Sequence, residues 1–227
     1  MENKKDYYIG HRKRLKDRFV KIGSKALEDY EILELILFFV IKRKDTKTIA
    51  KSLIKRFGDI GSILASEDKL LKEIEGVGDQ VVHFFRVIKE IHQRQMRNKI
   101  IKKPILNCLS DVIDYCSLKM SNSKREHLRL LFLNQKNKLI IDEVHQVGTV
   151  NQVKFYPREV IERALDLGAT SLIMVHNHPS GDPEPSESDV KVTKQVYIAC
   201  DSLGLVLHDH FIIGRNSYAS MKDLGYI

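Results

Sequence analysis

The sequence predicts two parts, a helical N-terminal half followed by a C-terminal α/β domain with a mixed sheet. Apolar residues recur at helical spacing in the first half, whereas patterns typical of strands begin only after Pro104. The polar, basic segment 94–103 precedes that proline, so we place the domain boundary between 1–103 and 104–227. A chain of 227 residues, 43% of them apolar, excludes disordered and low-complexity proteins.

The N-terminal half is expected to be helical and to contain no strand. One helix covers about 27–41, where leucine, isoleucine and phenylalanine form a wide apolar face. The next begins after a capping Asp45 or Thr46 and ends at Gly58, a residue type common at helix ends. A further helix covers about 81–95.

Strands and helices alternate in the C-terminal half. A hairpin comes first, a helix then begins at Pro157, where proline suits the first turn, and two further strands flank a second helix. The expected ranges are strands at 127–133, 139–144, 171–175 and 205–213, and helices at 157–164 and 186–203. Elements mixed in this way predict an α/β domain of about 120 residues.

The positive charge of the chain is concentrated in its first half. The formal net charge is +8, and residues 1–103 hold 25 of the 38 basic and 15 of the 30 acidic residues. A basic module can neutralise phosphates and so bind nucleic acid without reading its sequence. A solvated, lysine-rich surface explains the same composition, so DNA is an expected partner of this half on equal terms with that alternative.

Gly76, Val77 and Gly78 form a short turn between two predicted helices. The segment resembles the hairpin of a helix-hairpin-helix motif, in which uncovered backbone amides next to a helix N-terminus hold a DNA phosphate. An ordinary turn between helices explains the same residues equally well. Three basic residues on the next helix are candidates to flank a bound phosphate: Arg86, Lys89 and Arg94.

Neither a membrane span nor a signal peptide is expected. The longest apolar run is 35–41, far shorter than the roughly 20 residues of a membrane helix. The N-terminus is charged and lacks the apolar core of a signal peptide. The three cysteines are scattered and form no C-x-x-C pair, so we expect a cytoplasmic protein without a disulfide framework and without membrane partners.

His176, His178 and Asp189 predict a metal centre with one Zn²⁺ per chain. Alternate residues of a strand share a face, so the two imidazoles point the same way, and Asp189 falls in the first turn of the next helix. Two imidazoles and a carboxylate are a common zinc set that leaves a fourth position for water, whose pKa zinc lowers to about 7. Ser186-x-x-Asp189 also matches a capping box, so Asp189 could instead serve only the helix start.

The spacing of these residues resembles the JAMM motif of JAB/MPN metalloproteases, His-x-His-x10-Asp with Pro-Ser-x-x-Asp at its end. The resemblance implies hydrolysis of peptide or isopeptide bonds, with His176, His178 and Asp189 as the zinc ligands. It also implies that the Ser186 hydroxyl donates to the developing oxyanion. For Ser186, a role as helix N-cap is an equally good interpretation.

The same resemblance implies a glutamate general base that precedes a strand. Glu126, directly before the predicted strand 127–133, is the candidate. Such a base takes a proton from the attacking water and later gives it to the leaving amine. Glu143 is the alternative, and the sequence leaves the choice between the two open.

Further segments make nearly all of residues 10–227 similar to the RadC family. They are His-Asn-His-Pro-Ser-Gly-Asp-Pro at 176–183, Gly-Thr-Val-Asn at 148–151, Pro-Arg-Glu at 157–159, His-Asp-His-Phe-Ile-Ile-Gly at 208–214, and Gly-His-Arg-Lys-Arg-Leu at 10–15. The resemblance implies a bacterial cytosolic protein with a helix-hairpin-helix-like domain and a cytidine-deaminase-like JAB domain, and it brings a DNA-repair label. The chain lacks the insertions by which eukaryotic relatives hold ubiquitin, so the protein substrate stays unknown.

Two other functions fit the same residues. The chain could be a DNA-binding protein whose JAB domain is catalytically quiet and serves for docking. It could also be a metal-dependent nuclease, although enzymes of the HNH class spread their residues over a longer unit than the contiguous His-Asn-His here. His208 and His210 are expected to share a strand face and to be structural, and Asn177 is expected to point away from its neighbours.

Overall fold

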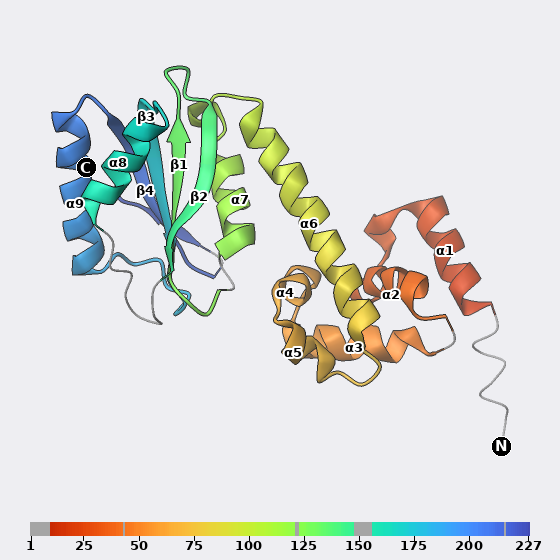
Figure 1. Cartoon of the computed structure of the whole chain (residues 1–227). Helices are drawn as coiled ribbons and strands as arrows, with labels where there is room; N and C mark the ends of the chain where they lie inside the picture. The colour runs from red at the N-terminus through yellow and green to blue at the C-terminus, as the bar shows by residue number, and fades with distance from the viewer. Residues whose placement is uncertain (1–9, 43, 121–122, 148–155, 216) are drawn as a thin grey trace. The chain divides into compact units, whose positions relative to one another are not determined.

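A computed structural model of the chain describes residues 10–42, 44–120, 123–147, 156–215 and 217–227 (Figure 1). The chain divides into two compact units, Met1–Ile91 and His92–Ile227. This division falls inside a long helix, α6 (Asp79–Ile101). The boundary expected from the sequence, between 103 and 104, lies just beyond the end of that helix. The 148–151 segment used for the RadC resemblance lies outside the described residues.

The described part of the N-terminal unit is helical, as predicted, and its buried apolar residues form a main core and a smaller cluster around Leu15. In chain order the helices are α1 (His11–Ile22), α2 (Asp29–Val40), α3 (Thr46–Phe57), α4 (Ile60–Ala65), α5 (Asp68–Lys72) and the first part of α6. Asp45 caps α3 by accepting the Lys47 backbone N–H at 3.0 Å. The main core forms because α2, α3 and α6 each turn an apolar stripe inward, with Leu33, Leu53 and Phe85 fully buried.

Helix α6 is longer than the sequence pattern indicates. We expected it to end near residue 95 because the segment 94–103 is polar and basic. Met96 and Ile100 in that segment are buried, and both belong to the apolar core of the C-terminal unit. Two apolar residues four positions apart on one helix face are enough to continue the packing, so the predicted linker is helix.

The C-terminal unit is built on a mixed five-stranded sheet, in agreement with the predicted fold class. The strands are β1 (His127–Leu133), β2 (Leu139–Val147), β3 (Ser171–Asn177), β4 (Val206–Ile213) and β5 (Tyr218–Ser220). They lie in the order β2-β1-β3-β4-β5, and only β3 and β4 are parallel. Helix α9 (Glu187–Ser202) connects these two parallel strands, as a parallel pair requires.

Helices cover both faces of this sheet (Figure 1). The side chains of β1 alternate between the faces: Leu131 and Leu133 pack with α7 (Leu109–Met120), a helix that the sequence pattern does not predict. Leu128 and Leu130 pack on the other face with α8 (Pro157–Asp166) and α9. The carboxyl end of β3 and the amino end of α9 therefore meet on the face of the sheet that α8 and α9 cover.

No helix in the described ranges combines the length and the apolar character that crossing a bilayer requires. The three cysteines are buried and free, so no disulfide links them.

Candidate metal centre

His176 and His178 lie at the carboxyl end of β3, as the sequence predicts. His176 is the penultimate residue of the strand and pairs with Ile212 of β4. The His178 N–H donates to the Ile213 carbonyl at 2.9 Å, which continues the ladder one residue past the strand. The two side chains therefore share a face, and their Nε2 atoms are 2.9 Å apart.

Asp189 of α9 completes the group. Its Oδ1 is 3.4 Å from His176 Nε2, and its Oδ2 is 3.4 Å from His178 Nε2. Donor atoms about 2 Å from a tetrahedral zinc ion lie roughly 3.3 Å apart, which these separations approach. Among the residues that the structure describes, this group alone brings three histidine, cysteine or carboxylate ligands together, within 4.8 Å of one another.

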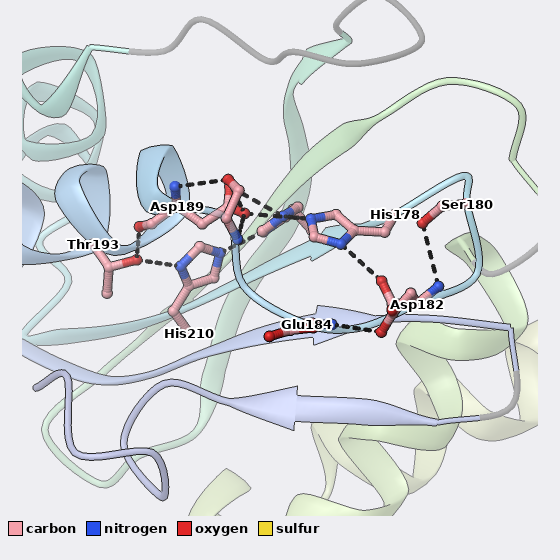
Figure 2. Close-up of polar contacts among 9 residues, drawn as sticks. His178, Ser180, Asp182, Glu184, Asp189, Thr193 and His210 are labelled. Atoms are coloured by element: carbon pink, nitrogen blue, oxygen red, sulfur yellow. Dashed lines mark hydrogen bonds and ion pairs between the residues drawn. The ribbon is translucent and has the colours of Figure 1, made fainter.

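The loop between His178 and α9 fixes the His178 ring. The ring Nδ1 donates to the Asp182 carbonyl at 2.8 Å (Figure 2), so the lone pair of the neutral ring is on Nε2. The loop packs against the turn after β4, where the Arg215 N–H donates to Gly181 at 3.0 Å. A Cβ on Gly214 would lie 2.5 Å from the Gly181 carbonyl oxygen, so glycine at 214 is needed for this contact.

The three groups differ in their affinity for protons. Burial lowers the pKa of His176 to about 4. The hydrogen bond to Asp189 raises the pKa of His178 above its ordinary value, against the opposing effect of burial. Burial would raise the pKa of Asp189, but hydrogen bonds from His178 and Ser186 bring it well below the ordinary value. Two of the three ligands are therefore ready to bind a cation at neutral pH without losing a proton.

Ser186 is the N-cap of α9. Its Oγ accepts the Asp189 N–H at 3.2 Å and donates to Asp189 Oδ2 at 2.6 Å. The Ser186 N–H also donates to Oδ2, at 2.8 Å, which completes a capping box. The capping interpretation of Ser-x-x-Asp and the ligand interpretation are therefore compatible, because the cap uses Oδ2 and leaves the carboxylate facing the two rings.

Glu126 lies directly before β1 and is half-buried. Its charge contributes to the raised pKa of His178, so it lies near the candidate ligands. Both peptide groups beside it are held by the fully buried Asn177: the His127 N–H donates to Asn177 Oδ1 at 2.9 Å, and Asn177 Nδ2 donates to the Arg125 carbonyl at 3.1 Å. Asn177 thus fixes the backbone that carries Glu126, a role that we did not predict.

Glu143, the alternative base, has another partner. Arg163 of α8 donates to both of its carboxylate oxygens, at 2.8 and 3.0 Å. This hydrogen bonding lowers the pKa of Glu143. A carboxylate held in this way is a poor proton acceptor.

His210 touches the metal centre although the sequence did not connect it with the site. Its Nε2 is 2.8 Å from His176 Nδ1. Its Nδ1 is 2.6 Å from the Thr193 hydroxyl (Figure 2). A register irregularity in β4 opposite Leu172 and Ile173 explains this position. Before it Leu207 faces α9, whereas after it Phe211 faces α7, so the alternation is broken and His210 is turned toward His176.

His208 takes another direction and contacts Asn137 Oδ1 at 2.9 Å through its Nε2. The expectation that His208 and His210 share a face assumed regular alternation, and the bulge interrupts it. The bulge in β4 turns the two histidines to different surroundings, and the residue pattern of the strand does not predict this bulge.

The two glycines of the predicted hairpin have different surroundings. Gly76 has a φ of +90°, and a Cβ there would lie 2.6 Å from Ile49 Cδ1, so the fold itself requires glycine. Val77 is buried in the N-terminal core. The Gly78 carbonyl accepts from Val81 and Val82 at the start of α6, and a Cβ on Gly78 would meet no atom within 4 Å. Packing therefore explains why residue 76 is a glycine, but it does not explain the glycine at 78.

A family model described as a RadC-like JAB domain matches residues 106–226. The match covers more than half of the chain and includes the three candidate ligands, Glu126 and Asn177.

Proposed function

The chain belongs to the family of RadC-like JAB domain proteins, and from this we propose that its C-terminal domain is a zinc-dependent hydrolase of peptide or isopeptide bonds. The observation that carries the proposal is the convergence of His176, His178 and Asp189 from two different elements. Two imidazoles and one carboxylate are the donor set of catalytic zinc sites that keep a position open for water. Bound zinc would supply Lewis acidity and a water of lowered pKa.

In this mechanism Glu126 moves the proton. Its carboxylate accepts a proton from the attacking water and later passes it to the nitrogen of the leaving amine. Asn177 supports this role because it holds the peptide groups on both sides of Glu126. A base must be held within hydrogen-bond reach of the water, and a fixed backbone limits the positions that its side chain can take.

Ser186 is proposed to donate its hydroxyl hydrogen to the oxyanion that forms on the scissile carbonyl. In the structure that hydrogen is directed to Asp189 Oδ2. The hydroxyl therefore has to turn from the ligand to the substrate as charge develops. A donor of this kind contributes roughly 3 kcal/mol to the stability of a transition state.

The test uses the Glu126→Gln variant, which keeps the shape of the side chain but cannot accept a proton. We expect it to bind zinc as the native chain does and to retain cellular proteins that the native chain cleaves, identified by trapping on the immobilised variant. Glu143→Gln is the matched control and should cleave the trapped proteins normally. Loss of cleavage in Glu143→Gln but not in Glu126→Gln would contradict the assignment of the base.

The same preparation separates the hydrolase from its alternatives. A native chain that binds zinc and cleaves none of the proteins retained by the variant would favour a quiet docking domain. Cleavage of supercoiled plasmid that depends on metal and on His178 would favour a nuclease.

We also propose that the N-terminal unit binds DNA through backbone phosphates. Gly78 supports this proposal, because a Cβ there would meet no atom within 4 Å. Lys42 and Lys44 line the groove beside it, together with the acidic residues Glu73, Glu75 and Asp79. Phosphate contacts of this type read no base sequence.

The three buried, free cysteines are consistent with a reducing cytoplasm as the site of action.

A further inference from the structure

Two buried polar residues behind the candidate ligands form a chain of hydrogen bonds that ends on His176. Thr193 of α9 is 0% exposed and His210 of β4 is 1% exposed. Neither is a ligand, and neither is explained by the hydrolysis mechanism. We propose that Thr193 and His210 are positioning residues that fix the tautomer of His176, so that its Nε2 lone pair is always available to the metal. This inference rests on the proposed metal centre.

The direction of the chain is set at Thr193. Its Oγ1 is 2.6 Å from the Asp189 carbonyl oxygen and 2.6 Å from His210 Nδ1. A carbonyl oxygen can only accept, so the single hydroxyl hydrogen of Thr193 goes to Asp189. The hydroxyl oxygen is then the acceptor for His210, and the proton of the His210 ring is on Nδ1.

The tautomer of His176 follows from that of His210. A buried imidazole is stable in its neutral form, so His210 with a proton on Nδ1 has a lone pair on Nε2. His210 Nε2 is 2.8 Å from His176 Nδ1, and this contact is a hydrogen bond only when His176 Nδ1 carries a proton. Neutral His176 then has its lone pair on Nε2, the atom 3.4 Å from Asp189 Oδ1.

The chain joins two of the three candidate ligands. It begins at the carbonyl of Asp189 and passes through Thr193 to His210 (Figure 2). From there it ends at the ring of His176, so it links α9, β4 and β3. Without the Thr193 hydroxyl, His210 has no acceptor for its Nδ1 proton and the two rings can reverse their tautomers. His176 would then hold a proton on Nε2, which a metal ion must displace before it can bind.

The test compares Thr193→Val, which keeps the shape of the side chain without the hydroxyl, with Thr193→Ser, which keeps the hydroxyl. Zinc affinity is measured by competition with a chelator at neutral pH. We expect Thr193→Val to bind zinc about 10- to 100-fold more weakly than the native chain, the range typical for loss of a group that orients a ligand. Thr193→Ser should bind zinc as the native chain does.

A third variant controls for loss of packing. Val196 is fully buried on the same helix, in the apolar core beneath the site. Val196→Ala should lower the stability of the domain and leave zinc affinity unchanged. Native affinity in Thr193→Val, equal weakening in Thr193→Ser, or equal weakening in Val196→Ala would each overturn the proposal.

A second measurement does not depend on any variant folding or on metal binding. The ¹⁵N chemical shifts of the histidine rings in the metal-free native chain report which nitrogen carries the proton. We expect protons on Nδ1 of both His176 and His210. A proton on His176 Nε2 with a free Nδ1 would contradict the relay even if zinc binds. A native chain with the expected tautomers that binds no zinc would contradict the proposed function and leave the tautomer assignment standing.

Discussion

At the residue scale, the candidate centre shifts the pKa values of its two histidines in opposite directions. His176 is buried and has a pKa of about 4, so it stays neutral over the whole physiological range. His178 interacts with Asp189 through its Nε2, and the pKa of His178 is raised from its ordinary value of 6.5. A proton on His178 and a cation therefore compete for the same Nε2 lone pair.

This asymmetry predicts how zinc binding depends on pH. Zinc binds only the neutral form of His178, so the affinity for zinc should fall as the pH drops through the raised pKa of His178. This fall should begin at a higher pH than it would for an ordinary histidine. His176 and Asp189 have already lost their protons in that range, so about one proton should be released for each zinc bound. Zinc competition titrations between about pH 5 and pH 8 give the number of protons released, as the slope of the logarithm of zinc affinity against pH. Release of two protons below about pH 6, where zinc-bound water still holds its proton, would show that His176 is not held neutral.

The residues of the site differ in how far the sequence alone could identify them. His176, His178 and Asp189 were predictable because strand alternation and a capping box are local rules, and both hold here. His210 was not predictable because the bulge in β4 reverses the side on which it lies. Asn177 was missed because its side chain points away from the metal centre and acts on the backbone of a strand that is distant in sequence.

At the scale of elements, one ion pair ties β2 to α8 and supplies a control for the assignment of the base. Glu143 and Arg163 are joined by two hydrogen bonds, and these lower the pKa of Glu143 below 4.5. A depressed carboxyl pKa stabilises the folded state above the unfolded pKa, and the contribution is lost as the pH falls through the folded pKa. The ion pair should therefore stabilise the folded chain at neutral pH and not in acid.

Glu143→Gln is accordingly predicted to destabilise the chain by up to about 1 kcal/mol at neutral pH, because the pair is partly exposed to solvent. The difference from the native chain should shrink as the pH is lowered below 4.5. Urea unfolding at several pH values measures this trend, and zinc affinity in the same variant should be unchanged. A stability difference that persists in acid would mean that the carboxylate acts through shape and not through charge.

The end of α6 carries a second prediction at this scale. Met96 and Ile100 pack into the C-terminal core, so a fragment that begins at residue 104 lacks part of its own core. Within the full chain, Ile100→Ala should cost about 2–5 kcal/mol, the range for removing a fully buried isoleucine side chain. Denaturant unfolding of 92–227 and 104–227 should likewise show the longer fragment to be the more stable. Equal stability of the two fragments would place the boundary at 103/104, as the sequence suggested.

The elements themselves were largely predictable, and their ends were not. The strand 127–133 and the start of the helix at Pro157 agree with the structure because alternation and the proline rule act within a few residues. The end of α6 depends on contacts with a sheet that the local pattern of charges does not show. Helix α7 has five buried residues, but in the sequence these are mixed with the polar residues of its exposed face.

At the scale of the whole molecule, the excess of basic residues is partly committed to the structure. Arg12 donates to the carbonyls of Ile41 and Lys44, which follow α2. Arg86, one of the residues expected to flank a bound phosphate, instead contacts Asp68 and the carbonyls of Leu64 and Ser66. The proposal of DNA binding therefore depends on the remaining lysines and on Gly78 more than on the total charge.

A pair of variants at Gly78 tests that proposal. Gly78→Asp and Gly78→Asn have similar shape and both cap a helix well, so neither should disturb α6. The added negative charge in Gly78→Asp should weaken binding to duplex DNA by roughly tenfold at low salt, and Gly78→Asn should weaken it less. Fluorescence anisotropy across a salt series measures both affinities. Native affinity in both variants would exclude the hairpin as the phosphate contact.

The most direct test of the central claim is the metal content of the full chain. After dialysis against buffer with trace zinc, elemental analysis of the native protein should find about one zinc per chain. Asp189→Asn keeps the capping shape of the side chain but removes its charge, and it should lose most of that zinc while the protein stays folded. A native chain without bound metal, or an Asp189→Asn chain that keeps the full amount, would contradict the account.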